Sequence, residues 1–187
     1  MKIIGITGTI GAGKGTIVKY LVSKKGFVHY SVRDFLNEEI KKRGLTANRD
    51  NMVVVANELR TKYSPYYIIE QLYNRAKKSG RENCVIESIR TSGEVNFLRK
   101  QKNFYLFAID AKTKIRYNRI FVRGSETDHI SYKIFTDNEN REMTSNNPNK
   151  QNLSKCIEMA DYVFNNDKDF SYLYNQIENV LKKIRHS

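Results

Sequence analysis

Short apolar runs alternate with longer amphipathic stretches along the whole chain. The apolar runs cover residues 2–7, 27–31, 83–88, 103–110 and 161–166. Most positions in them are apolar, which is typical of parallel strands whose two faces are both covered by helices. Because each run is followed by a stretch of helical periodicity, the pattern predicts repeated strand–helix units and a mostly parallel sheet.

The helical stretches carry recognisable start and stop signals. Ser31 and Asp34 match a capping box for one helix, whereas Ser64 is expected as the N-cap of another, with Pro65 at its first helical position. Glycines follow several of the predicted helices, where they are common after the last turn. The expected helices cover residues 14–25, 32–43, 49–63, 65–79, 91–101, 112–123, 150–160 and 169–185.

One segment, residues 124–149, departs from this alternation because it is polar, charged and weakly periodic. We expect it to be a mobile insert rather than part of the core. We find no internal repeat and no linker, and 187 residues are enough to bury about 70% of the surface of the unfolded chain. The sequence therefore predicts a single domain.

A glycine-rich segment, "GTIGAGKGT", directly follows the first predicted strand and precedes the first helix. A G-x-x-x-x-G-K spacing between a strand and a helix is a P-loop, in which backbone N–H groups and the helix N-terminus surround a phosphate. Lys14 is expected to reach the β- and γ-phosphates of a nucleotide. The predicted phosphate-binding residues are Gly8, Thr9, Ile10, Gly11, Ala12, Gly13, Lys14, Gly15 and Thr16.

The "GKGT" form of this loop resembles that of adenylate kinase and the wider nucleoside monophosphate kinase family. The segments at 29–44, 85–91 and 119–124 are similar to further motifs of that family, so the resemblance extends over most of the chain. It implies a three-layer α/β/α P-loop NTPase fold with a five-stranded parallel sheet of order 2-3-1-4-5. The core would comprise 1–31, 81–123 and 150–187, with acceptor-binding helices in 32–80 and a lid in 124–149.

The same resemblance implies roles for individual side chains, with ATP and Mg²⁺ as cofactors. Gly15 stands where Ser or Thr usually binds Mg²⁺, so Thr16, one position later, and Glu87 are the candidate metal ligands. Arg119 and Arg123 would neutralise charge on the transferring phosphoryl group. The candidate catalytic residues are Lys14, Asp34, Arg90, Arg119 and Arg123, and the candidate acceptor-binding residues are Arg33, Asp34, Arg43, Glu87 and Arg90.

Asp34 leaves the acceptor open. The nucleoside monophosphate kinase family has an arginine where this chain has Asn37, and the segment 156–177 is also similar to dephospho-CoA kinase, which places an aspartate after its second strand. A hydroxyl acceptor benefits from a carboxylate that takes its proton, whereas a phosphate acceptor is already an oxyanion. Asp34 is thus either a general base or only a helix cap.

The charge of the chain suggests further partners. Its formal net charge is +13, but the basic residues are scattered in short groups without a basic tail, which favours a small anionic, nucleotide-like acceptor over a polynucleotide. A nucleic-acid kinase or binding protein and an inactive, regulatory kinase-like module remain alternatives. The sequence does not decide the oligomeric state.

Cysteine usage and hydropathy indicate the compartment. Cys84 and Cys156 are far apart and outside any CxxC motif, which fits buried, reduced thiols. No targeting segment or membrane-spanning run is recognisable, so we expect a cytoplasmic protein that does not associate with membranes. His29, His129 and His186 have no metal-ligand spacing and receive no role.

Overall fold

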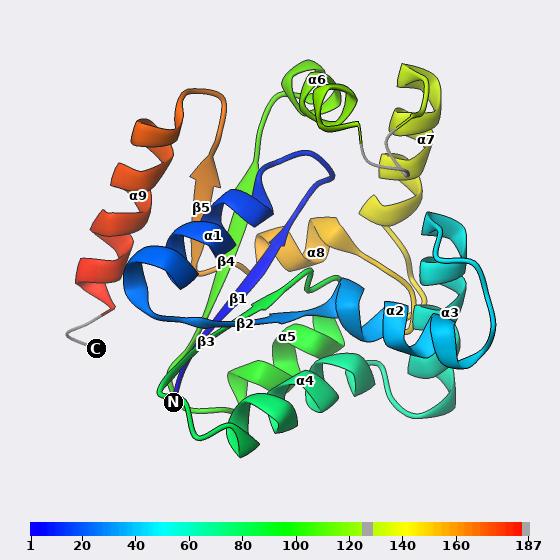
Figure 1. Ribbon diagram of the computed structural model, residues 1–187, viewed down its shortest axis with the longest axis horizontal. Helices are drawn as coiled ribbons and strands as arrows, with labels where there is room; N and C mark the ends of the chain where they lie inside the picture. Colours follow the sequence, from blue (N-terminus) through cyan, green and yellow to red (C-terminus); the bar gives the residue numbers. More distant parts are fainter. Residues whose placement is uncertain (125–128, 185–187) are drawn as a thin grey trace.

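Five parallel strands form the central sheet of the computed structural model (Figure 1), which describes residues 1–124 and 129–184. The sheet order is β2-β3-β1-β4-β5, as predicted. β1 is central, and its Gly5 lies opposite Ile86 of β3 and Leu106 of β4. The strands are β1 (Lys2–Gly8), β2 (Val28–Ser31), β3 (Asn83–Glu87), β4 (Phe104–Asp110) and β5 (Tyr162–Asn165).

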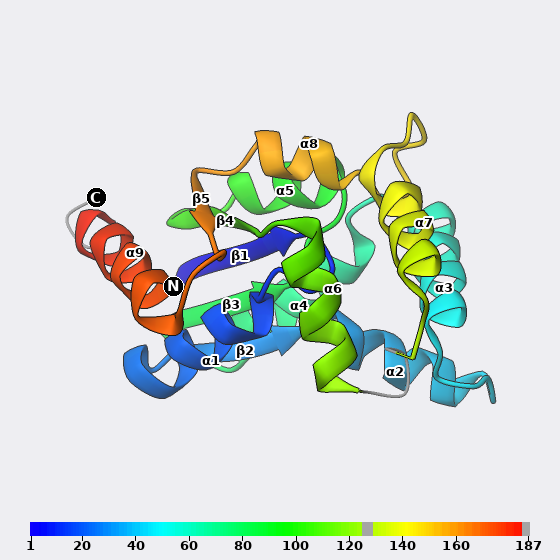
Figure 2. The ribbon, with the colours of Figure 1, turned by 90° about the horizontal axis from the view of Figure 1, so that it is seen from above.

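Helices cover both faces of this sheet. α1 and α9 lie on one face, whereas α4, α5 and α8 lie on the other (Figures 1 and 2). α2, α3, α6 and α7 gather beyond the carboxyl ends of the strands, where parallel sheets bind their ligands. The helices are α1 (Lys14–Lys25), α2 (Val32–Lys42), α3 (Arg49–Lys62), α4 (Tyr67–Lys78), α5 (Ser92–Arg99), α6 (Thr113–Arg123), α7 (Tyr132–Met143), α8 (Leu153–Glu158) and α9 (Phe170–Lys183).

The strands contribute to two hydrophobic clusters, one on each side of the sheet. Ile4 and Ile6 pack in the cluster of α1 and α9, whereas Ile3 packs in the cluster of α4, α5 and α8. Successive strand residues point to opposite faces, so two buried faces require the nearly continuous apolar runs seen in the sequence. Cys84 and Cys156 are free and buried, as expected, and burial raises the pKa of each thiol to about 12.

α4 and α8 begin two and three residues later than the sequence predicts, α8 at Leu153. α4 begins at Tyr67, not at Pro65, because the Tyr67 amide donates to the Ser64 carbonyl (3.1 Å) in a preceding turn. The predicted Ser64 cap was therefore wrong. At α2 the Ser31 hydroxyl accepts from the Asp34 amide (3.1 Å), which is one half of the expected capping box.

The expectation that the insert at 124–149 is not part of the core was wrong for the part that the structure describes. Residues 132–143 form α7, which buries Phe135 and Glu142. Its C-terminal end meets the N-terminal end of α3 (Figures 1 and 2), where Arg49 contacts Glu142. The two buried positions of α7 are seven residues apart, and one of them is charged. The hydrophobic periodicity of α7 is therefore weak. Residues 125–128 of the predicted lid lie outside the described residues.

In the ranges 1–124 and 129–184, none of the helices combines the length and the apolar character needed to cross a bilayer.

Candidate active site

The loop between β1 and α1 has the backbone shape that its glycines allow. Gly8, Gly11 and Gly13 all have positive φ values, of 138°, 74° and 104°. A Cβ atom at Gly8 would lie 2.1 Å from the Ile109 carbonyl oxygen, and one at Gly13 would lie 2.2 Å from Nδ2 of Asn166. The path of this loop therefore requires glycine at these positions.

The N-terminus of α1 is open to an incoming anion. Gly13 is its N-cap and supplies no side-chain acceptor. The Thr16 amide donates to the Gly13 carbonyl (2.9 Å), whereas the amides of Lys14 and Gly15 precede the first bonded turn of the helix and are available to a phosphate. The space beside Gly15 is also open, because a Cβ atom there would meet nothing within 4 Å. Free backbone donors next to open space fit the phosphate groups of a nucleotide.

The ammonium group of Lys14 folds back over this loop. Its Nζ donates to the carbonyl oxygens of Gly8 (2.9 Å) and Thr9 (2.8 Å). Burial, together with the nearby positive charge of Arg90, lowers the pKa of Lys14 to about 7, against the opposing influence of Glu87. The ammonium group is poorly compensated without a ligand, as is typical of a group that binds an anion.

A cavity of about 410 Å³ opens in front of the loop. Four of the side chains singled out in the sequence meet Lys14 there, namely Thr16, Glu87, Arg119 and Arg123. Nη2 of Arg119 donates to the Asn166 carbonyl (2.7 Å), whereas its Nη1 is buried and has no partner among the described residues. The cavity is lined by Gly11, Gly13, Lys14, Gly15, Thr16, Glu87, Arg119, Ile120, Arg123, Asn166 and Phe170.

Glu87 lies at the end of β3, and its Oε2 is within hydrogen-bond distance of Nε2 of His29 (3.1 Å). Although burial opposes ionisation, the His29 hydrogen bond and the charge of Lys14 lower the pKa of the Glu87 carboxyl. An ionised carboxylate and the Thr16 hydroxyl in one cavity are the oxygen donors that Mg²⁺ uses together with substrate phosphates. Within the described ranges no cluster of three His, Cys, Asp or Glu could hold a metal ion by itself.

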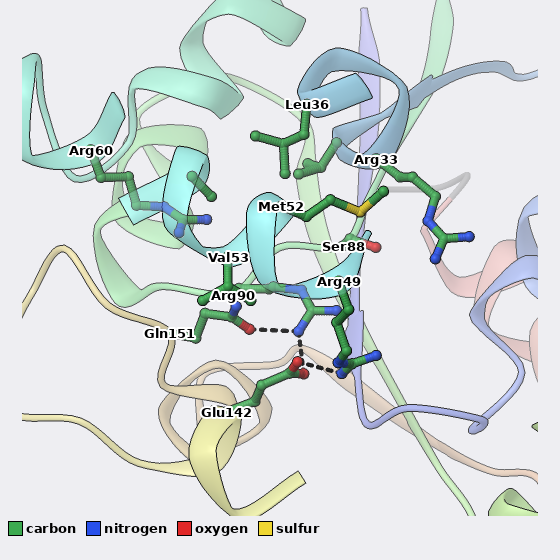
Figure 3. Close-up of a pocket in the computed structure, with 12 residues that line it drawn as sticks. Arg33, Leu36, Arg49, Met52, Val53, Arg60, Ser88, Arg90, Glu142 and Gln151 are labelled. Atoms are coloured by element: carbon green, nitrogen blue, oxygen red, sulfur yellow. Dashed lines mark hydrogen bonds and ion pairs between the residues drawn. The ribbon is translucent and has the colours of Figure 1, made fainter. Parts of the chain in front are cut away.

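A second cavity, of about 100 Å³, lies among α2, α3 and the segment after β3 (Figure 3). Its polar lining is dominated by four arginines: Arg33, Arg49, Arg60 and Arg90. The apolar wall of the cavity comes from the same two helices, α2 and α3, and is formed by Val32, Leu36, Met52, Val53 and Ala56. Ser88, Glu142 and Gln151 complete the lining. The cavity thus offers both an anion-binding and an apolar surface.

Arg90 is held by two side-chain partners. Its Nη1 donates to Glu142 (2.5 Å) and to Gln151 (2.6 Å), as Figure 3 shows. The chain reaches Arg90 through Ser88, whose φ of 72° is rare for a residue with a side chain. The amides of Ser88 and Ile89 both donate to the Ile6 carbonyl at 3.0 Å, which holds this turn against β1.

Glu142 belongs to α7 and joins two of the arginines. One carboxylate oxygen accepts from Arg90, and the other accepts from Arg49. Although burial opposes ionisation, the charges of Arg90 and Arg49 lower the pKa of the Glu142 carboxyl.

A buried ion pair fixes the base of the same cavity. Nε and Nη2 of Arg60 donate to one oxygen of Glu94 at 3.0 and 2.9 Å, and both side chains are almost completely buried. The other oxygen of Glu94 accepts from the amides of Arg90 (2.7 Å) and Thr91 (3.1 Å). Thr91 and Glu94 form a full capping box for α5. Glu94 therefore connects α3 to the backbone that carries Arg90.

We expect the substitution Glu94→Gln to destabilise the fold by about 3–5 kcal/mol, because it leaves the Arg60 charge buried without a counter-ion. Urea denaturation followed by circular dichroism measures this change. The control is Glu158→Gln, which removes an exposed pair with Lys155 and should cost less than about 1 kcal/mol. Equal effects of the two substitutions would contradict the role given to the Arg60–Glu94 pair.

Two predicted acceptor-site residues lie elsewhere. Asp34 is exposed and lines neither cavity, and Arg43 pairs with Glu58 (2.6 Å) on the surface. Of the other candidates, Arg33 and Arg90 line the arginine cavity, whereas Glu87 lines the cavity of the glycine-rich loop.

Other residues of the site were not singled out in the sequence. Arg49 and Arg60 lie eleven residues apart and share the cavity-facing side of α3 with Val53 and Ala56. This helical spacing could have placed both arginines on one face. Glu142 and His29 gave no such signal, because their partners come from distant segments.

The sheet order and the glycine-rich loop define a kinase-like P-loop fold. The family model described as the AAA domain matches residues 4–147. A UPF0200 protein of Methanococcus maripaludis is 32% identical over 186 residues, covering 98% of each chain, and one of Methanocaldococcus jannaschii is 33% identical over 187 residues, covering 98% of this chain and 91% of its own. The chain therefore belongs to the UPF0200 family and carries the AAA domain.

Solved structures support the same fold. TT1252 from Thermus thermophilus superimposes with a TM-score of 0.63 at 18% identity, covering 97% of both chains. A shikimate kinase from Bacteroides thetaiotaomicron gives a TM-score of 0.54 at 16% identity over 98% of both chains. A sugar kinase from Janibacter gives 0.55 at 14% identity, covering 97% of this chain and 93% of its own. At these identities the likeness concerns the fold.

Proposed function

We propose that the protein is an ATP-dependent kinase that transfers the γ-phosphate to a nucleoside or deoxynucleoside monophosphate. The observation that carries this proposal is the arginine-lined cavity near the glycine-rich loop. Arg90 of that cavity is close enough to Lys14 to lower its pKa. An acceptor in one cavity would then present its phosphate to a nucleotide in the other.

The charges of the acceptor cavity favour an anion. In the part of the chain that the structure describes, Glu94 pairs with Arg60, and Glu142 pairs with Arg49 and Arg90. The fourth arginine, Arg33, interacts with Glu87 of the neighbouring cavity, so the arginines outnumber these carboxylates. Guanidinium groups bind phosphate through paired hydrogen bonds. The apolar wall, which includes Met52 and Leu36, suits the flat face of a base. A molecule with one phosphate and one apolar ring system matches both surfaces.

The chemistry proposed requires little beyond positioning and charge neutralisation. Lys14 and the loop amides would bind the ATP phosphates, and Arg119 and Arg123 would neutralise the charge that develops on the transferring group. Mg²⁺, held through Glu87 and Thr16, would neutralise the phosphates when bound. A phosphate acceptor needs no general base, and the exposed position of Asp34 outside both cavities supports such an acceptor over a hydroxyl.

A substrate panel tests this proposal. The folded protein is incubated with ATP, Mg²⁺ and each nucleoside or deoxynucleoside monophosphate, and ADP formation is followed with a coupled assay. We expect turnover with at least one monophosphate and none with dephospho-CoA. Activity with dephospho-CoA alone would show that the acceptor group is a hydroxyl and not a phosphate. Inactivity on every acceptor, together with salt-sensitive binding of an oligonucleotide, would favour a nucleic-acid partner.

Lys14 makes nucleotide binding dependent on pH. Its pKa of about 7 in the free protein leaves it mostly neutral at pH 8, and the negative charge of a bound triphosphate would raise that pKa. Binding at pH 8 should therefore take up close to one proton, and the Kd should rise about tenfold per pH unit above 7. Below pH 7 this contribution disappears, because Lys14 is already protonated.

Titration calorimetry at pH 8, in two buffers of different ionisation enthalpy, measures the proton uptake. The matched control is Lys14→Arg, whose guanidinium stays protonated at this pH and should bind without uptake. Equal uptake by both proteins would show that another group titrates.

A further inference from the structure

Glu142 occupies an unusual position for a carboxylate. It lies on α7, its side chain is buried, and its two oxygens bind Arg90 and Arg49 at the acceptor cavity (Figure 3). Two guanidinium groups bridged by one carboxylate form the arrangement that also binds a phosphate group. The protein thus fills part of its own anion-binding site with a side chain.

We propose that Glu142 is a specificity-determining residue: a tethered anion that only an acceptor with a dianionic phosphate displaces from Arg90 and Arg49. This inference rests on the proposed function, because it assigns the phosphate of the acceptor to these two arginines. A carboxylate acceptor would then fail to displace Glu142, and a neutral hydroxyl acceptor would offer no anion to these arginines.

The charges of the competing groups support this exchange. A phosphate monoester carries a charge of about −1.5 to −2 at pH 7 and three acceptor oxygens, whereas Glu142 carries one charge and two oxygens. Coulomb attraction to the arginines scales with that charge. A free carboxylate has the same single charge as Glu142, so it gains no extra attraction to the arginines. Glu142 also acts at a high effective concentration, because the fold holds it next to them.

Glu142 does not satisfy all the hydrogen-bond donors of the arginines that line the cavity. Nε of Arg49 and Nη1 of Arg60 are buried and have no hydrogen-bond partner among the described residues. Buried donors without partners are costly. A phosphate group has enough oxygens to replace the contacts of Glu142 and to reach at least one more of these donors.

Displacement of Glu142 has a consequence for α7. Its contacts with α3 include the buried Glu142–Arg49 pair and the exposed Arg141–Asp50 pair (3.3 Å). When the phosphate of the acceptor binds Arg49 and Arg90, the Glu142–Arg49 pair breaks, and α7 is held more loosely against α3. Acceptor binding should therefore loosen the backbone of α7, although α7 contributes only Glu142 to the lining of the cavity.

Binding measurements test the competition without any need for turnover. Wild-type protein and Glu142→Gln are titrated with inorganic phosphate, with acetate and with the monophosphate series in a calorimeter. We expect Glu142→Gln to bind inorganic phosphate at least about tenfold more tightly, because a competing charge is gone, and to bind acetate detectably. Equal or weaker phosphate binding would overturn the proposal and make Glu142 an organiser of the arginines.

Asp50→Asn is the matched control. It breaks the other ion pair between α3 and α7 and leaves the arginine cavity intact, so its phosphate affinity should equal that of the wild type. A gain in Asp50→Asn as large as that in Glu142→Gln would show that loosening α7 is sufficient, and would also overturn the proposal.

Hydrogen exchange on the wild-type protein gives a readout that does not depend on the variant folding. Amides of residues 132–143 should exchange faster when inorganic phosphate saturates the cavity, whereas unchanged or slower exchange would contradict displacement. If these results hold but no monophosphate is phosphorylated, the anion exchange stands and the proposed function fails.

Discussion

Replacing Lys14 with alanine is expected to lower kcat/KM for ATP by about 10³-fold or more, because a positively charged side chain at the transferring phosphoryl group can be worth about 10³ to 10⁵. Lys14 is the ionisable side chain of the glycine-rich loop and lines its cavity, where a bound triphosphate would hold it in its protonated, positively charged form. Its contacts in the free protein are with two loop carbonyls, so a ligand phosphate would provide its first strong anionic partner there.

The fold should survive this substitution. The lowered pKa of Lys14 means that its charge is unfavourable in the ligand-free protein, so alanine removes little stabilisation. Thermal unfolding and the coupled ADP assay, run on the same preparation, separate the two effects. Lys19→Ala, an exposed position of α1, is the control, and turnover by Lys14→Ala near the wild-type rate would exclude a nucleotide in this loop.

Arg90→Ala is expected to lower kcat/KM for the acceptor by about 10²- to 10³-fold and to leave the KM for ATP nearly unchanged. Arg90 lies at the boundary of the two cavities, since it lines the acceptor cavity and also affects Lys14. Alanine removes the guanidinium and leaves Glu142 with Arg49 as its remaining arginine contact. Both changes weaken the binding of an anionic acceptor.

Steady-state kinetics with each substrate varied in turn measure this effect. Arg75→Ala removes an exposed arginine of α4 that pairs with Glu38, and it should behave as the wild type. A change confined to the KM for ATP would place Arg90 at the nucleotide instead of the acceptor.

The sheet and the glycine-rich loop could be predicted because their determinants are local. The order of strands and helices follows from runs of apolar residues, and the loop follows from glycines whose backbone angles no other residue adopts easily. The residues of the loop cavity also follow the chain order, because α1 follows β1, Glu87 ends β3 and α6 follows β4, all at the carboxyl end of the sheet. These elements bring together Lys14, Thr16, Glu87, Arg119 and Arg123.

The arginine cavity was harder to predict, because its lining residues come from segments that meet only in the folded chain. Glu142 is separated from Arg49 by 93 residues along the chain and from Arg90 by 52, and no periodic pattern links such positions. Asp34 is the opposite case, in which a local signal was clear and the role in the site was left open. Its spacing from Ser31 satisfied a local rule, and its amide does bond to the Ser31 hydroxyl, but its side chain lies outside both cavities.

Calorimetric titration with MgATP tests most directly whether this glycine-rich loop holds a nucleoside triphosphate. We expect the wild-type protein to show a saturable heat with a stoichiometry close to one, and Lys14→Ala to lose most of the affinity. A folded wild-type protein that gave no binding heat with MgATP or MgGTP would contradict both the nucleotide site and the kinase reaction built on it.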